Sequence, residues 1–153
     1  MKILIADDSE EKIKDLKSFF EELGCEYQIE VTCSFKETVR VLLKNEFDFV
    51  LLDMTMPRSS NTSRTTKKKR SLAGKDVVST LGFNNKTNIK FVIFSRFGEF
   101  GRLDEVKSLD EIYSEMVEEH EQIFLGCINY DTSDDESWKS QLLKIIKTDI
   151  LSD

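Results

Sequence analysis

The sequence predicts an α/β fold built around a parallel sheet. Along its 153 residues, short apolar segments alternate with segments that repeat apolar residues at helical spacing. The apolar segments are nearly continuous, which is typical of strands buried on both faces. Two of them, residues 1–6 and 47–52, end directly in carboxylates. We therefore expect five strand–helix units, right-handed crossovers, and helices on both faces of the sheet.

The first half of the chain supplies three strands and two helices. Ser9 is suited to cap the first helix and Gly24 to end it, and Ser34 is suited to cap the second. Apolar residues of the first helix fall at helical spacing, as Ile13, Leu16, Phe20 and Leu23. The expected strands are Lys2–Ala6, Tyr27–Cys33 and Asp48–Leu52.

The second half begins with a polar tract, Arg58 to Ser71, and then resumes the alternation. A short helix is predicted at Gly74–Leu81, and a long one at Leu103–Glu119 from the spacing of its apolar residues. A last helix is expected to start at Asp134 or Asp135. The fourth and fifth strands are predicted at Lys90–Ser95 and Ile123–Asn129.

Composition limits the class of protein. The net charge of −7 argues against generic binding to nucleic acid or anionic membranes. Three widely spaced cysteines, Cys25, Cys33 and Cys127, indicate reduced thiols rather than a disulfide framework. No apolar run approaches the ~20 residues that span a bilayer, and the chain opens on a strand rather than a signal peptide. We expect one cytoplasmic domain without a membrane segment.

Carboxylates follow two of the predicted strands. Asp7 and Asp8 follow the first strand, and Asp53 follows the third. The carboxyl ends of parallel strands meet at one edge of the sheet, where open α/β folds bind ligands. Clustered acids repel one another unless a cation lies among them, and oxygen ligands suit Mg²⁺. Helix capping is the alternative explanation for each acid, although it requires only one acid in the Asp7–Asp8 pair.

These residues resemble the receiver domain of two-component response regulators. The resemblance rests on the Asp7-Asp8 pair, on Asp-Met-Thr-Met-Pro at residues 53–57, and on Ser95 at the end of the fourth strand. It implies a flavodoxin-like (βα)₅ sheet with strand order 2-1-3-4-5, as one receiver-like domain over residues 1–153. It also implies that Asp53 accepts a phosphoryl group and that Ser95 is the switch hydroxyl. The implied Mg²⁺ ligands are Asp7, Asp8, Asp53 and the backbone carbonyl of Thr55.

The resemblance implies a stand-alone regulator in a phosphorelay. Its partner would be a histidine kinase or phosphotransfer protein, because the only histidine, His120, lies in a charged helical segment. Output would pass to an unknown downstream protein through protein contacts. Enzymatic activity would be limited to self-phosphorylation and dephosphorylation at Asp53.

The chain departs from the family pattern at the end of the last strand. The family carries a lysine there, and Asn129 occupies the matching position, followed by Tyr130. An amide donates hydrogen bonds but cannot neutralise phosphoryl charge. Arg96 stands where the family prefers a small residue. We expect Arg96 to replace part of the lost charge, with an arginine pointing into solvent as the alternative.

A second departure is an insertion at about residues 59–73. In the family a glycine follows the acceptor aspartate by eight residues, whereas here the matching residue is Gly74. The insertion holds a basic cluster: Arg64, Lys67, Lys68, Lys69 and Arg70. A solvated loop is one interpretation, and a loop that docks an acidic partner or a phosphate is the other. Nucleic acid is a weak candidate, since no aromatic residue is interleaved with the cluster.

Two other functions compete with the phosphorylated receiver. A pseudo-receiver would use the same fold as a phosphorylation-independent binding module, and the lost lysine favours it. A phosphohydrolase with an aspartate nucleophile is the third candidate. The Asp53 motif lacks the second acid, two residues on, that such enzymes use for acid–base work.

Overall fold

The computed structural model describes nine stretches of the chain: residues 1–24, 27–57, 73–83, 89–96, 99–100, 107–120, 124–130, 133 and 135–150. A five-stranded parallel sheet forms their centre, with strand order β2-β1-β3-β4-β7. Its strands are β1 (Lys2–Ala6), β2 (Gln28–Thr32), β3 (Phe49–Leu52), β4 (Lys90–Ser95) and β7 (Phe124–Asn129). The predicted order 2-1-3-4-5 is confirmed, with β7 as the fifth strand.

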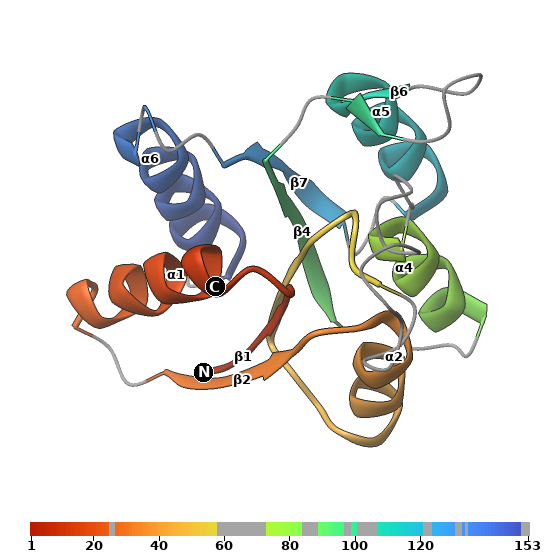
Figure 1. Cartoon of the computed structure of the whole chain (residues 1–153), viewed down its shortest axis with the longest axis horizontal. Coiled ribbons are helices and arrows are strands. Elements are labelled where there is room, and N and C mark those ends of the chain that lie inside the picture. Colours follow the sequence, from red (N-terminus) through yellow and green to blue (C-terminus); the bar gives the residue numbers. More distant parts are fainter. Residues whose placement is uncertain are drawn as a thin grey trace.

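Helices cover both faces of the sheet (Figure 1). α1 (Glu10–Glu22) and α6 (Asp135–Ile145) lie on one face, and α2, α4 and α5 lie on the other. The bounds of the latter three are Phe35–Lys44, Ala73–Phe83 and Leu109–His120, and a turn of π-helix, Ile146–Ile150, continues α6. None of the helices in these stretches is long and apolar enough to cross a bilayer.

Alternate residues of the central strands separate the core into two layers. On β1, Leu4 packs toward α2, α4 and α5, whereas Ile3 and Ile5 pack toward α1 and α6. The layer beneath α1 and α6 is aromatic and includes the fully buried Trp138. Because both faces are covered, the strands are apolar throughout, and their polar residues gather where they end.

Local signals that begin and end the first two helices act as predicted. The Ser9 side chain accepts a hydrogen bond from the backbone of Lys12, and the Ser34 side chain accepts one from Glu37. Gly24 follows α1 with a φ of 72°, a left-handed conformation that glycine adopts without steric cost.

The long helix predicted at Leu103–Glu119 is wrong at its start. Lys107–Ser108 form a strand, β6, which pairs antiparallel with β5 (Glu99–Phe100), and α5 begins at Leu109. The spacing of the apolar residues carried the prediction too far toward the N-terminus. Ser108, followed three residues later by Glu111, has the pattern of a capping box and marks a helix start at this point.

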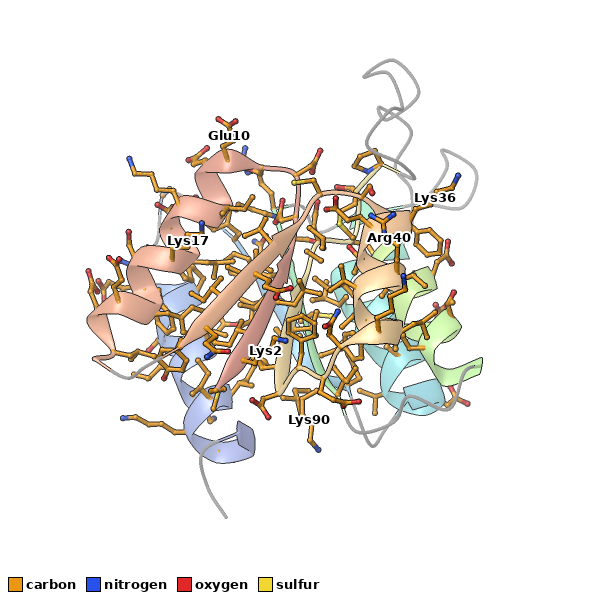
Figure 2. The ribbon with its side chains drawn as sticks, turned by 90° about the horizontal axis from the view of Figure 1, so that it is seen from below. Lys2, Glu10, Lys17, Lys36, Arg40 and Lys90 are labelled. Carbon is orange, nitrogen blue, oxygen red and sulfur yellow. The ribbon has the colours of Figure 1, made fainter. Side chains whose placement is uncertain are left out.

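The amino ends of the strands and their carboxyl ends lie on opposite sides of the sheet (Figure 2). Lys2 and Lys90 are the first residues of β1 and β4, and they mark the amino edge. The carboxyl edge lies at the other side, near Glu10 at the start of α1. The basic insertion expected at 59–73 lies, apart from Ala73, outside the described residues.

Candidate functional site

Three carboxylates converge at the carboxyl edge of the sheet. Asp7, Asp8 and Asp53 each offer one oxygen, and these oxygens lie within 4.8 Å of one another. Backbone hydrogen bonds that continue the strand ladders hold the two strand ends: Asp7 N donates to Thr32 O (2.9 Å), and Asp53 N donates to Ala6 O (2.8 Å). The convergence of acids predicted from the strand ends is therefore present.

Two of these acids are almost completely buried. Asp7 and Asp53 are 2% and 5% exposed. Burial and, next, the negative charge of Asp53 together raise the pKa of the Asp7 carboxyl from 3.8 to about 6, and the Lys12 ammonium opposes this rise. Asp7 also accepts a hydrogen bond from Ser9 N through Oδ1 (2.8 Å). Burial and the charge of Asp53 disfavour the ionised form of Asp7, which a bound cation would stabilise.

The donor set fits a hard divalent cation. Mg²⁺ takes carboxylate oxygens and usually only one or two from the protein, with water or substrate oxygens completing its shell. Asp7, Asp8 and Asp53 each bring one carboxylate oxygen to within 4.8 Å of the others, so the site offers enough oxygen ligands for such an ion.

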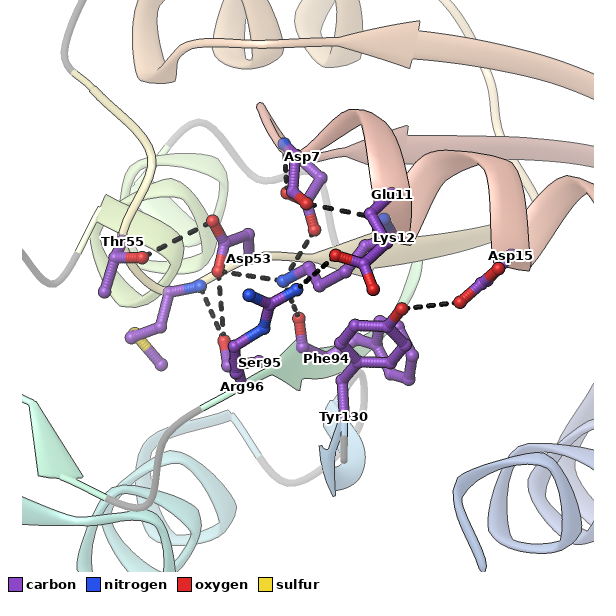
Figure 3. A network of polar contacts seen from close by, with 12 residues as sticks. Asp7, Glu11, Lys12, Asp15, Asp53, Thr55, Phe94, Ser95, Arg96 and Tyr130 are labelled. Atoms are coloured by element: carbon purple, nitrogen blue, oxygen red, sulfur yellow. Dashed lines mark hydrogen bonds and ion pairs between the residues drawn. The ribbon is translucent and has the colours of Figure 1, made fainter. Parts of the chain in front are cut away.

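Hydroxyl groups approach Asp53 from two sides (Figure 3). Ser95 is 1% exposed, and its Oγ donates to Asp53 Oδ1 (3.2 Å) while accepting from Met54 N (3.0 Å). Thr55 Oγ1 donates to Asp53 Oδ2 (3.5 Å). Ser95 comes from β4 and Thr55 from the loop after β3, so both oxygens of Asp53 have partners.

A lysine from α1 completes this group. Lys12 is 3% exposed, and its Nζ lies 2.7 Å from Asp7 Oδ2, 3.3 Å from Asp53 Oδ1 and 3.0 Å from Phe94 O. An ammonium has three protons to donate, and it faces three acceptors here. The site therefore contains an internal positive charge between two of its acids.

Comparison with known proteins identifies the family. A family model described as "response regulator receiver domain" matches residues 3–93. The Detocs response regulatory protein DtcB from Enterobacter cloacae is 36% identical over 149 residues, which cover 95% of this chain and 98% of DtcB. The chain belongs to the response regulator receiver domain family.

Solved receiver structures share the fold. The response regulator TrrA from Thermotoga maritima, in complex with Mg²⁺–BeF, has a TM-score of 0.55 and 19% identity, with 94% of this chain and 97% of that chain covered. The Mn²⁺-bound form of response regulator Rcp1 has a TM-score of 0.65 and 11% identity, with 99% and 96% covered. These likenesses, with the observed strand order, confirm the flavodoxin-like fold.

The receiver's last strand carries no cation at its end. Asn129 pairs with Ser95 in the β4–β7 ladder and is exposed. With its amide nitrogen turned toward the nearby carbonyls, Asn129 donates to Arg96 O (2.8 Å) and Ser95 O (3.2 Å). Asn129 therefore ties two strand ends together at the position of the family's lysine.

Arg96 lies on the surface of the receiver rather than in contact with Asp53. Its guanidinium pairs with Glu11 Oε2 (3.1 Å) and lies 5.4 Å from the centre of the Tyr130 ring. Tyr130, whose side chain is buried, donates in turn to Asp15 on α1. The charge that we expected from Arg96 is found beside Asp53 on Lys12 instead.

Sequence reasoning missed Lys12, although the chain carries a signal for it. Lys12 lies four residues before the buried Leu16, on the apolar stripe of α1, where a charged side chain is unexpected. It also occupies the third position of the helix, where a capping box would place glutamate. A lysine at a buried helical position beside two aspartates indicates an internal ion pair.

Proposed function

We propose that this receiver is a stand-alone response regulator that accepts a phosphoryl group on Asp53 in the presence of Mg²⁺. The observation that carries the proposal is the convergence of Asp7, Asp8 and Asp53, with Ser95 hydrogen-bonded to Asp53, at the carboxyl edge of the sheet. Phosphoryl transfer needs little more from a protein than positioning and compensation of charge.

The reaction forms one bond and breaks another. A carboxylate oxygen of Asp53 bonds to phosphorus, the bond from phosphorus to the donor's histidine nitrogen breaks, and its electron pair stays with that nitrogen. Asp7, Asp8, Asp53 and the Thr55 carbonyl would hold Mg²⁺, which when bound compensates the charge of the incoming phosphoryl group. The chain's own contribution is to keep Asp53 fixed between Ser95 and Thr55.

Ser95 would transmit the modification of Asp53 to β4. Its hydroxyl now donates to Asp53 Oδ1 and accepts from Met54 N. A phosphoryl group on Asp53 offers strong acceptor oxygens, so the hydroxyl would turn toward them. Because Ser95 ends β4, this change reaches the strand and the residues after it, which is the local event that a switch requires.

Relatives and chemistry support the proposed partners. The alignment with DtcB covers 98% of that response regulatory protein, which supports a single receiver-like domain over residues 1–153. Phosphate would come from a histidine kinase or a phosphotransfer protein. The signal would pass to a downstream protein through surface contacts, in which the basic insertion is a candidate.

Incubation with radiolabelled acetyl phosphate and Mg²⁺ tests the proposal. We expect radiolabelled phosphate to be incorporated through a bond that base cleaves, as in an acyl phosphate. We also expect shifts of backbone NMR signals around Asp53 and Ser95 with Mg²⁺ and beryllofluoride. Asp53→Ala should abolish both effects. Asp48→Ala, which removes an exposed aspartate whose carboxylate accepts from Lys2 N, should retain them.

The pseudo-receiver is the second candidate, and one observation favours it. The strand end that carries the family's lysine offers an amide here, and that amide bonds to backbone carbonyls. A wild-type protein that neither incorporates phosphate nor responds to beryllofluoride would establish this second function and overturn the first.

A further inference from the structure

The burial of the Lys12 ammonium costs hydration free energy, which only contacts with acceptors in the folded protein can offset. An ammonium moved out of water loses several kcal/mol of hydration even after the protein relaxes. Lys12 recovers part of that loss through Asp7, Asp53 and the carbonyl of Phe94, so each of its three protons has an acceptor. These acceptors come from the ends of β1, β3 and β4, so Lys12 lies where the three strands meet.

The position of Lys12 in α1 adds a second cost. Ser9 caps the helix, and Glu10 and Glu11 occupy its first two positions, as the helix dipole favours. Lys12 follows them, with its charge near the positive end of the dipole. Helix stability therefore does not explain a lysine here, whereas the charge of the neighbouring acids does.

At the β7 end of the carboxyl edge, the described residues direct no positive charge at Asp53. The amide of Asn129 donates to the carbonyls of Ser95 and Arg96, and the guanidinium of Arg96 pairs with Glu11. Within the part of the chain that the structure describes, Lys12 is the cationic side chain that forms an ion pair with Asp53. The internal cation among these residues therefore comes from α1.

We propose that Lys12 is the residue that neutralises phosphoryl charge in this receiver, in place of a lysine at the end of the last strand. This inference rests on the proposed phosphorylation of Asp53. Before transfer, the ammonium holds the carboxylates of Asp7 and Asp53 at fixed positions. It thereby positions the nucleophile and lowers the repulsion that an incoming phosphoryl group meets.

The change in charge during the reaction gives Lys12 its role. When Asp53 Oδ1 or Oδ2 bonds to phosphorus, the aspartate loses its carboxylate charge, and negative charge accumulates on the phosphoryl oxygens. The ammonium then exchanges its weakened contact with Asp53 for a contact with a phosphoryl oxygen. Its bonds to Asp7 Oδ2 and Phe94 O anchor it during this exchange.

The same geometry makes Lys12 a competitor of the metal ion. Its Nζ lies 2.7 Å from an oxygen of Asp7, one of the three acids that form the cation site. A divalent cation drawn to that carboxylate is repelled by the ammonium. Lys12 should therefore weaken Mg²⁺ binding while accelerating phosphoryl transfer, two effects that a purely structural ion pair would not produce together.

Replacement of Lys12 by an uncharged side chain of similar length separates these effects. We expect Lys12→Met to bind Mg²⁺ about 10-fold more tightly, as measured by NMR titration without phosphodonor, since repulsion between the two cations is removed. At saturating Mg²⁺ we expect phosphorylation by acetyl phosphate to slow about 100-fold, as is typical when one charge-stabilising group is removed. The double variant Lys12→Met/Asn129→Lys, which supplies an ammonium from β7, should regain at least about 10-fold in rate.

The matched control is Lys17→Met, the same substitution on the exposed surface of α1, where the side chain points outward (Figure 2). It should leave both Mg²⁺ affinity and phosphorylation rate within about 2-fold of wild type, because charges exposed to water are screened. If Lys12→Met matches Lys17→Met in both measurements, the inference about Lys12 is overturned while phosphorylation of Asp53 stands. If wild type itself fails to incorporate phosphate, the proposed function fails first.

A second substitution tests the inference if Lys12→Met does not fold. If urea unfolding shows that Lys12→Met is not folded, Lys12→Arg keeps the charge but spreads its protons over a planar fork, which cannot direct three of them at these three acceptors. We then expect Mg²⁺ affinity within about 3-fold of wild type and phosphorylation slowed at least about 10-fold. An unchanged rate in Lys12→Arg would overturn the positioning role of the ammonium.

Discussion

The two ends of the carboxyl edge of the sheet differ in how closely they follow the receiver family. At the β1–β3 end, Asp7, Asp8 and Asp53 have the spacing and convergence that the family resemblance implies. At the β7 end, Asn129 and Tyr130 replace the expected lysine and the residue after it, and the amide of Asn129 bonds to backbone. The positive charge absent from the second end reappears at the first, on Lys12.

This difference teaches that a charge can be supplied to one point in a fold from more than one element. The carboxyl edge is surrounded by strand ends and by the N-terminus of α1, so a long side chain from either can reach Asp53. If Asp53 accepts a phosphoryl group as proposed, an ammonium near it supplies the compensation of charge on which phosphoryl transfer depends. The proposal requires this ammonium to lie near Asp53, whether a helix or a strand carries it.

The largest expected effect is at the β1–β3 end, where Asp7 makes the free energy of unfolding depend on pH. The folded protein keeps the Asp7 proton up to about pH 6, whereas the unfolded chain releases it near 3.8. Between those values the unfolded state binds fewer protons, so stability falls as pH rises, and the full cost is present above about pH 6. The shift corresponds to a loss of about 3 kcal/mol at about 1.4 kcal/mol per pKa unit.

Urea unfolding at several pH values, with EDTA to remove divalent ions, measures this loss. Asp7→Asn removes the titrating group, so its stability relative to wild type should increase as pH rises from about 4 to 6. A difference between the two proteins that stays constant over this range would show that Asp7 does not carry the cost.

Removal of a ligand at the acidic end should produce the next largest effect. We expect Asp7→Asn to weaken Mg²⁺ binding at pH 8 by at least about 100-fold, the upper end of the loss that follows removal of a residue that only orients a metal ligand. Isothermal titration calorimetry measures this affinity. Asp15→Asn, which alters an acid bonded to Tyr130 rather than one of the three converging carboxylates, is the control and should change it by less than about 3-fold.

Sequence reasoning predicted the acidic end of the site and not Lys12, for a physical reason. Asp7 and Asp53 end apolar strands, and parallel strands bring their carboxyl ends together, so a local pattern was sufficient. The burial of Lys12 depends on acceptors from three separate segments, Asp7, Asp53 and Phe94, which only the assembled sheet places around one nitrogen.

The fold shows the same division between local and assembled information. Strands Lys2–Ala6 and Lys90–Ser95 were predicted with their observed bounds, because apolar runs bounded by polar residues define both. The strand order came from the family resemblance, since pairing is not a local property. The helix predicted from Leu103 failed because apolar spacing continued through the β6 strand before α5.

A smaller effect is expected at Ser95, which ends β4 between the β1–β3 end and the β7 end of the carboxyl edge. Ser95→Ala removes the hydroxyl that accepts from Met54 N and donates to Asp53, and it leaves a buried N–H without its partner. We expect a loss of about 1–3 kcal/mol in the free energy of unfolding, measured in urea. Ser95→Thr retains the hydroxyl and should recover most of that loss, whereas equal losses in both variants would show that packing rather than hydrogen bonding is responsible.

The smallest effect is expected at the β7 end, and it decides whether the comparison holds. Asn129→Ala removes two hydrogen bonds to the carbonyls of Ser95 and Arg96, but the side chain is exposed, so water can replace the lost donors. We expect a loss of less than about 1 kcal/mol in unfolding free energy and a change of less than about 2-fold in the rate of phosphorylation by acetyl phosphate. If Asn129→Ala slowed phosphorylation as much as Lys12→Met, the β7 end would still act on the phosphoryl group. The charge of the site would then be shared between both ends rather than transferred to α1.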